Sequence, residues 1–260
     1  MARWPLPVKR LSQNFLTDPG VIQSIIDAVA LNMNQPLLEI GPGRGALTQV
    51  LLELNPESFT VIEIDRRLAQ SLHARYGDRV QVICDDILKI DIEALNPGNH
   101  GIQVVGNLPY HLSTPILIQC LEALDHIESM YFMLQKEVAE RISAAPGSKQ
   151  YGRLSVRTQV VCEAQLGLII PPEAFDPKPK VESAMIHLRP HPTIPPIQFE
   201  SLDRLLIEAF SKRRKQLGNA LKPLLTVPEI ESTGVDPSLR PECVSVDEFV
   251  RLSECLALKR

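Results

Sequence analysis

The sequence predicts an α/β fold, with a parallel sheet covered by helices and followed by a smaller all-helical module. Three observations predict it. Short apolar segments alternate with amphipathic segments of helical periodicity along the first half of the chain. A glycine-rich loop follows the first strand-like segment, at residues 41–45. Beyond a proline-rich stretch at residues 191–196 the hydrophobic pattern is helical only, which indicates a linker and then a helical module.

The first regular element is expected to be a helix that begins at Asp18-Pro19, because an acidic capping residue precedes a proline at the first helical position. Strands are predicted at residues 36–41, 59–65, 80–86, 102–107, 129–135, 167–170 and 183–188. Further helices are predicted at residues 46–54, 66–76 and 114–124. Strands this apolar, with helices between them, predict a sheet covered on both faces.

Composition limits the classes of protein that remain. The chain has 260 residues, and its 44% hydrophobic content is too high for a disordered protein. With 27 Lys+Arg against 31 Asp+Glu the net charge is −4, so any nucleic-acid binding must rest on local basic patches. The five cysteines form no CxxC pair, which argues against a disulfide framework and a structural metal site. No membrane-length apolar run or signal-peptide pattern is visible, and we expect a cytoplasmic monomer without metal.

The glycine loop predicts a nucleotide-like cofactor. Gly41, Gly43 and Ala46 satisfy the dinucleotide pattern, and Glu63 follows about 20 residues on, where an acid can accept hydrogen bonds from ribose hydroxyls. Both NAD and S-adenosylmethionine carry such a ribose. The alternative is a tight strand-to-helix turn that binds nothing.

The segment Asn107-Leu108-Pro109-Tyr110, at the end of the fourth predicted strand, favours methyl transfer to an aromatic amine. The amino group of adenine is a poor nucleophile, because its lone pair is delocalised into the ring. The Asn107 side-chain carbonyl and a backbone carbonyl, most simply that of Leu108, can accept its N–H groups and restore lone-pair density. Pro109 stiffens the loop, and Tyr110 offers an aromatic face to the base. The alternative is a turn in which Asn107 caps a helix and Tyr110 packs.

Taken together, several segments resemble one family. They are residues 13–16, 39–48, 62–65, 107–110, 132–141, 151–156, 171–184 and 209–221. This order of motifs resembles the bacterial small-subunit (16S) ribosomal RNA adenine N6,N6-dimethyltransferases, relatives of the erythromycin-resistance methylases. The resemblance implies a Rossmann-like, seven-stranded S-adenosylmethionine-dependent methyltransferase domain at residues 1–190, with an N-terminal arm at 1–17. It also implies a helical rRNA-binding domain at 197–260.

The resemblance also implies an activity and its residues. The reaction is dimethylation of two adjacent adenines in small-subunit ribosomal RNA, naked or in an immature subunit, during ribosome biogenesis. The residues implied to hold S-adenosylmethionine are Asn14, Leu16, Gly41, Glu63, Asp86 and Asn107. Two acids, Asp85 and Asp86, end the third predicted strand. The resemblance favours Asp86 for the cofactor, which leaves Asp85 as a capping or loop residue. Phe175 matches an aromatic that faces the base opposite Tyr110, although its proline-rich loop taken alone favours core packing.

Basic groups offer contacts for RNA phosphates. One group lies in the arm, at Arg3, Lys9 and Arg10. A second, acid-free group contains Arg141, Lys149, Arg153 and Arg157, the last two on one face if the segment is helical. A third is the run Lys212, Arg213, Arg214 and Lys215. We expect RNA contacts from Arg153, Arg157 and the run, and the alternative for each is a solvated face.

Two other functions fit parts of the sequence. An NAD-dependent oxidoreductase would use the same glycine loop, but among the histidines just His111 is close to the predicted site, and no other set for hydride transfer accompanies it. A ribosome-assembly factor that has lost catalysis would keep the fold. The intact segment 107–110 and Glu63 argue against that loss.

Overall fold

The computed structural model describes residues 4–7, 13–95, 101–212 and 214–259. The chain forms two compact units, and we name them the sheet unit (1–139 and 165–189) and the helical unit (140–164 and 190–260). Residues 140–164 therefore group with the C-terminal part, whereas the division expected from the sequence keeps them with residues 1–190.

The seven-stranded sheet predicted from the sequence is confirmed. Its strands are β2 (Leu37–Ile40), β3 (Phe59–Ile62), β4 (Gln81–Ile83), β5 (Ile102–Asn107), β6 (Ile127–Gln135), β7 (Cys162–Ile170) and β9 (Ser183–Pro190). They lie in the order β4-β3-β2-β5-β6-β9-β7. The strands from β4 to β6 are parallel, and β9 pairs antiparallel with β6. The chain steps outward from β2 to β4 and then returns to the other side of β2 with β5. The carboxyl ends of β2 and β5 therefore flank a topological switch point, where open α/β sheets bind ligands.

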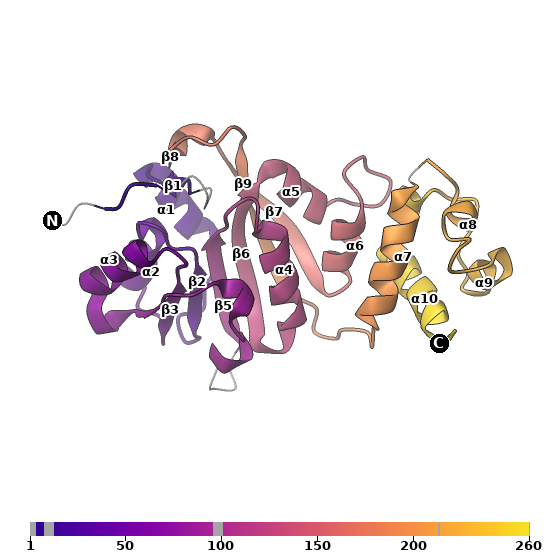
Figure 1. Ribbon diagram of the computed structural model, residues 1–260, viewed down its shortest axis with the longest axis horizontal. Helices are drawn as coiled ribbons and strands as arrows, with labels where there is room; N and C mark the ends of the chain where they lie inside the picture. Colours follow the sequence, from indigo (N-terminus) through magenta and orange to yellow (C-terminus); the bar gives the residue numbers. More distant parts are fainter. Residues whose placement is uncertain (1–3, 8–12, 96–100, 213, 260) are drawn as a thin grey trace. The chain divides into compact units, whose positions relative to one another are not determined.

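Helices cover the sheet as the apolar patterns predict. They are α1 (Pro19–Ala28), α2 (Ala46–Glu53), α3 (Arg66–Tyr76) and α4 (Ser113–Glu122), and the short α5 (Lys136–Ile142) follows β6. The Asp18 carboxylate accepts a hydrogen bond from the Val21 N–H and caps α1 as expected. Buried residues of α1, α2 and α3 share one core cluster with Phe175 and several strands. The buried face of α4 is not part of that cluster, and Figure 1 shows α4 crossing in front of the sheet.

A second, two-stranded sheet was not predicted. β1 (Phe15–Leu16) pairs antiparallel with β8 (Phe175–Asp176), and the Thr17 N–H continues the contact by donating to the Ala174 carbonyl at 2.8 Å. Two-residue strands are too short to produce a periodic pattern. This pairing fixes the last three residues of the N-terminal arm, 15–17.

The helical unit contains α6 (Arg153–Gln159), α7 (Phe199–Ser211), α8 (Leu217–Ala220), α9 (Val227–Ser232) and α10 (Val246–Ala257). Capping boxes begin two of its helices: Thr226 with Glu229 starts α9, and Ser245 with Glu248 starts α10. Its core includes Phe249, whose ring centroid lies 5.6 Å from that of the half-buried Phe210. Within the described residues, no helix of either unit is long and apolar enough to cross a bilayer.

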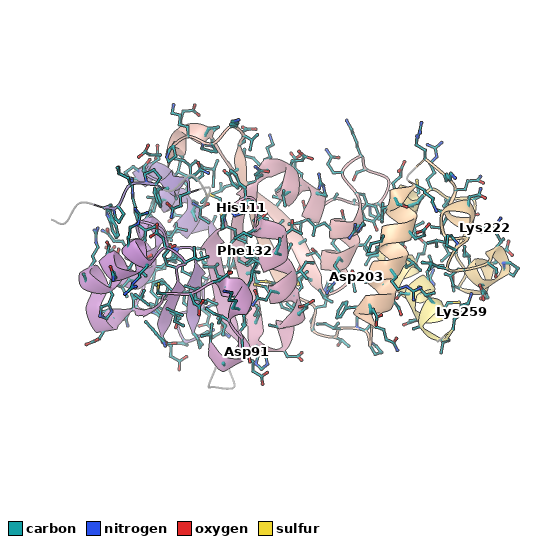
Figure 2. All side chains as sticks on the ribbon, in the orientation of Figure 1. Asp91, His111, Phe132, Asp203, Lys222 and Lys259 are labelled. Atoms are coloured by element: carbon teal, nitrogen blue, oxygen red, sulfur yellow. The ribbon has the colours of Figure 1, made fainter. Side chains whose placement is uncertain are left out.

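The expectation that Arg157 shares an exposed helix face with Arg153 is wrong. Both residues are in α6, but Arg157 is 4% exposed. Its guanidinium carbon lies 3.9 Å from the ring centroid of Phe199, and its Nε lies 3.5 Å from the Asp203 carboxylate, a residue labelled in Figure 2. The helical spacing predicted that Arg157 points outward. Because α6 packs against α7, Arg157 instead contacts residues inside the helical unit.

Candidate active site

A cavity opens at the switch point of the sheet unit and gathers residues that are far apart in sequence. Nine of the predicted site residues line it: Asn14, Leu16, Gly41, Glu63, Asp86, Asn107, Leu108, Pro109 and Tyr110. They come from the arm, from the loops after β2, β3, β4 and β5, and from the end of β5 itself. The carboxyl ends of parallel strands meet at one edge of a sheet, which explains why the loops converge there.

Glycines shape the loop between β2 and α2. Gly41, Gly43 and Gly45 have φ values of 70°, 58° and 73°, in the left-handed region that favours glycine. A Cβ on Gly43 would lie 2.9 Å from a ring carbon of Phe15, so this position also lets the arm pack against the loop backbone. The loop is thus shaped by its own turn and by the segment that covers it.

Glu63 is buried at the end of β3, with 4% of its surface exposed. Its carboxylate accepts hydrogen bonds from the Gly43 N–H at 3.0 Å and from the Asp65 N–H at 2.9 Å. Burial raises the pKa of Glu63, and these backbone N–H groups oppose that shift. Each carboxylate oxygen can accept more than one hydrogen bond, so Glu63 can hold the glycine loop and still accept ligand hydroxyls.

The two acids that follow β4 differ in their exposure and contacts. Asp85 and Asp86 both line the cavity, but Asp85 is exposed while Asp86 is half-buried. Asp86 Oδ1 also caps a short 3₁₀ turn by accepting from the Leu88 N–H at 3.1 Å. Capping anchors the Asp86 side chain at the wall of the cavity.

Asn107 and its neighbours form another part of the lining. Asn107 Nδ2 donates to the Asn14 carbonyl at 3.2 Å, and no described residue donates to its amide oxygen or to the Leu108 carbonyl. The Tyr110 hydroxyl lies 2.8 Å from Ser183 Oγ at the start of β9, which fixes the ring; burial raises the pKa of Tyr110. The site therefore presents two carbonyl acceptors beside a fixed aromatic ring.

The sequence analysis missed three residues that line the cavity or position its side chains. Ile64, next to Glu63, lines the cavity with 47% of its surface exposed and supplies an apolar face. Ser183 positions Tyr110 from 73 residues away. Glu39, in β2, also lines the cavity, is 2% exposed and accepts a hydrogen bond from the Thr48 hydroxyl at 2.6 Å. A lone acid in an otherwise apolar strand was the signal for Glu39.

Glu39 is expected to make the stability of the protein depend on pH. Burial, reinforced by Glu63, raises the pKa of Glu39 from its ordinary 4.5 to about 8. Between these values the folded protein keeps a proton that the unfolded chain releases, so this group lowers the free energy of unfolding by about 1.4 kcal/mol per pH unit as pH rises. Glu39→Gln keeps an acceptor for Thr48 and removes the titration. Urea unfolding should show the variant level with wild type near pH 4 and more stable by several kcal/mol near pH 8.5.

The exposed Glu53→Gln is the matched control and should not change the pH profile. An equal stability difference between Glu39→Gln and wild type at both pH values would contradict a neutral, buried Glu39.

Phe175 does not line the cavity, contrary to the role that the resemblance implied. It is 3% exposed, its backbone pairs with Leu16, and its side chain belongs to the core cluster of the sheet unit. The β1–β8 pairing turns it inward, which is the core packing that its own sequence context favours.

The basic groups are only partly described. Arg3, Lys9, Arg10 and Arg213 lie outside the described residues. Arg153, Arg214 and Lys215 are exposed, whereas Lys212 is half-buried and paired with Glu208. Among the described residues, no three His, Cys, Asp or Glu side chains are grouped to hold a metal ion.

Comparisons with known proteins match this geometry. The family model for ribosomal RNA adenine dimethylase matches residues 8–258. Relatives named ribosomal RNA small subunit methyltransferase A include those of Pseudomonas aeruginosa, 46% identical over 96% of this chain and 94% of the relative, and of Methylobacillus flagellatus, 46% identical over 96% and 97%.

Solved structures are also similar. A dimethyladenosine transferase from Plasmodium falciparum has a TM-score of 0.77 and 25% identity, covering 91% of this chain and 95% of the other. The 23S rRNA methyltransferase ErmE has a TM-score of 0.73 and 27% identity, covering 94% and 100%. The seven-stranded sheet with its switch-point cavity and the family match over nearly the whole length lead to one conclusion: this chain belongs to the ribosomal RNA adenine dimethylase family.

Proposed function

We propose that this protein dimethylates the N6 amino groups of two adjacent adenines in small-subunit ribosomal RNA. The observation that carries the proposal is a pair of carbonyl oxygens, Asn107 Oδ1 and Leu108 O, to which none of the described residues donates, beside the fixed ring of Tyr110 in one cavity. The relatives at 46% identity, which are named for the small subunit, support that substrate over the large-subunit RNA named for ErmE at 27%.

The methyl donor is S-adenosylmethionine, which when bound supplies a methyl group on a cationic sulfur that leaves as a neutral thioether. The cavity suits this donor because Glu63, Asp85 and Asp86 line it together with the neutral Glu39, while Arg44 is the one basic side chain along the described lining. Glu63 offers acceptors for ribose hydroxyls, Asp86 for an amino group, and Ile64 an apolar surface for a ring.

The residues of the chain act mainly by placing dipoles. Asn107 Oδ1 and the Leu108 carbonyl accept the two N–H groups of the target amine, which directs its lone pair toward the donor. The Asn14 carbonyl holds the Asn107 amide so that its oxygen faces away from the arm. Tyr110 stacks on the flipped base and offsets part of the cost of unstacking it. No strong base is needed, since the amine loses its proton to water after it has become cationic.

The direct test is methyl transfer to small ribosomal subunits from cells that lack these methyl groups. Nucleoside analysis of the RNA should find N6,N6-dimethyladenosine after incubation with wild type and very little with Asn107→Ala. Methylation of large-subunit RNA instead, or of no RNA, would overturn the substrate proposed here.

The two other functions make different predictions in the same preparation. An oxidoreductase would bind NAD in equilibrium dialysis, and family membership argues against it. His111, labelled in Figure 2, is exposed and is not part of the described cavity lining. A non-catalytic assembly factor would bind immature subunits and leave their adenines unmodified.

The basic run supplies a test of the RNA surface. Arg214 and Lys215 are exposed just beyond the end of α7, and Lys212 is partly neutralised by Glu208. Replacing Lys212, Arg214 and Lys215 by Gln should weaken binding to the subunit. The slope of log affinity against log salt should fall by about 0.7–0.9 for each phosphate that the variant no longer neutralises. Fluorescence anisotropy at several salt concentrations measures this slope.

Arg79 and Lys89, exposed in the sheet unit, provide the control for altered surface charge when both are changed to Gln. If the salt slope of the run variant equals that of wild type, the run is a solvated cluster whose positive charge interacts with the dipole at the C-terminal end of α7.

A further inference from the structure

One side chain of the glycine loop joins three segments around the cavity. The Arg44 guanidinium carbon lies 4.3 Å from the ring centroid of Phe15. Its Nη2 donates to the Pro5 carbonyl at 3.3 Å, and its Nη1 lies 3.4 Å from the Asp176 carboxylate in β8. Arg44 thus touches the arm at two points and β8 at a third, while its own backbone forms part of the cavity loop.

The arm segment that Arg44 touches is a wall of the cavity. Gln13, Asn14, Phe15 and Leu16 all line it. The Phe15 ring is in contact with the Arg44 guanidinium and also lies close to Gly43, where a Cβ would come within 2.9 Å of it. Removing the Arg44 side chain therefore removes one contact that holds this ring.

The same segment reaches the side-chain amide of Asn107. The Asn14 carbonyl, adjacent to Phe15, accepts the hydrogen bond from Asn107 Nδ2 at 3.2 Å. An amide group has its donor and acceptor on opposite sides, so this contact determines where the Asn107 oxygen points. A displaced arm would free the amide to rotate.

The polar contacts that hold the first described residues of the arm are individually weak. Two other arginines on α3 bind its first described residues: Arg67 Nη2 donates to the Leu6 carbonyl at 3.4 Å, and the Arg75 guanidinium lies 5.6 Å from the Trp4 ring centroid. Hydrogen bonds this long are at the weak end of the range, and paired β strands of two residues add little. Arg44 differs from the other two because it contacts the part of the arm that lines the cavity.

We propose that Arg44 is a positioning residue, which holds the arm against the cavity and thereby slows cofactor release and keeps Asn107 aligned. This inference rests on the proposed function in one respect, namely that the donor binds in this cavity. It assigns to Arg44 a role separate from direct contact with the reacting atoms.

The experiment compares Arg44→Ala, Arg44→Lys and Asp176→Asn with wild type by stopped-flow displacement of bound S-adenosylmethionine. We expect Arg44→Ala to raise the dissociation rate constant about tenfold, because contacts of this kind act mainly on dissociation. Arg44→Lys should lie between, since an ammonium group keeps the attraction to Asp176 but loses the flat contact with Phe15. Asp176→Asn should change the rate less than about threefold, because an ion pair with its acid 67% exposed contributes little.

A second readout separates positioning from simple destabilisation. Single-turnover methylation at saturating donor and subunit should be slower in Arg44→Ala, because the Asn107 amide is no longer held. A merely structural role would lower the thermal midpoint and leave both rates as in wild type. Arg66→Ala, an exposed arginine at the start of α3, is the matched control and should behave as wild type in both measurements.

The outcomes distinguish this inference from the function on which it rests. Donor release within twofold of wild type in a folded Arg44→Ala, with ribosomal RNA methylated normally, would overturn the role of Arg44 alone. Faster donor release in Arg44→Ala, with no ribosomal RNA methylated by wild type, would overturn the proposed substrate and leave the role of Arg44 standing. If Arg44→Ala does not fold, unchanged release in Arg44→Lys would decide against the proposal.

Discussion

Asn107→Ala should reduce the rate of methyl transfer about 100- to 1,000-fold while leaving binding of the ribosomal substrate nearly unchanged. The amide oxygen accepts no hydrogen bond from the described residues, so it is available to a substrate amine in the cavity. A dipole placed to assist the lone pair matters most when the new bond forms. The loss should therefore appear in single-turnover rates at saturating donor and subunit, and hardly in the dissociation constant of the RNA.

Two comparisons sharpen this prediction. Asn107→Asp keeps an acceptor and adds a negative charge near a cationic donor, so it should retain more activity than Asn107→Ala and change donor affinity. Tyr110→Ala should weaken RNA binding as well as the rate, because stacking acts on the bound base. Asn34→Ala, an exposed asparagine of the same unit, is the control. Methylation by Asn107→Ala at close to the wild-type rate would remove Asn107 from the mechanism even though family membership stands.

Glu63→Ala should weaken binding of S-adenosylmethionine by roughly 1.5–3 kcal/mol, or about 10- to 150-fold in the dissociation constant. The Glu63 carboxylate is buried and anchored by two backbone N–H groups, so the acceptors that it offers are fixed in place before the donor binds. Its removal also leaves the Gly43 N–H without this acceptor, which loosens the glycine loop. Isothermal titration calorimetry measures the affinity directly.

The control for this prediction is Glu57→Ala, which changes an exposed acid of the same unit. Thermal unfolding of both variants separates a defect in binding from a defect in folding. An unchanged dissociation constant in a folded Glu63→Ala protein would show that the donor binds without this acid, and would move the ribose contact to another carboxylate of the lining.

The sequence by itself determined the elements of the sheet unit and the cavity residues that share its edge. Apolar strands and amphipathic helices were identified by their periodicity, because burial on one face imposes a repeat that the local sequence must carry. Glu63 and Asn107 follow or end strands that the pattern predicts, and parallel strands bring their carboxyl ends together. No long-range information was needed for either residue.

The tertiary structure alone decided the direction in which particular side chains point. The spacing of α6 allowed an exposed Arg157, and packing against α7 buried it beside Phe199 and Asp203. The short strands β1 and β8, far apart in the sequence, pair with each other, and this pairing directs the Phe175 side chain into the core. It also places Asn14 within hydrogen-bond distance of Asn107. Contacts between distant segments leave no periodic trace in either one, since each segment satisfies its own local preferences equally well with the side chain facing in or out.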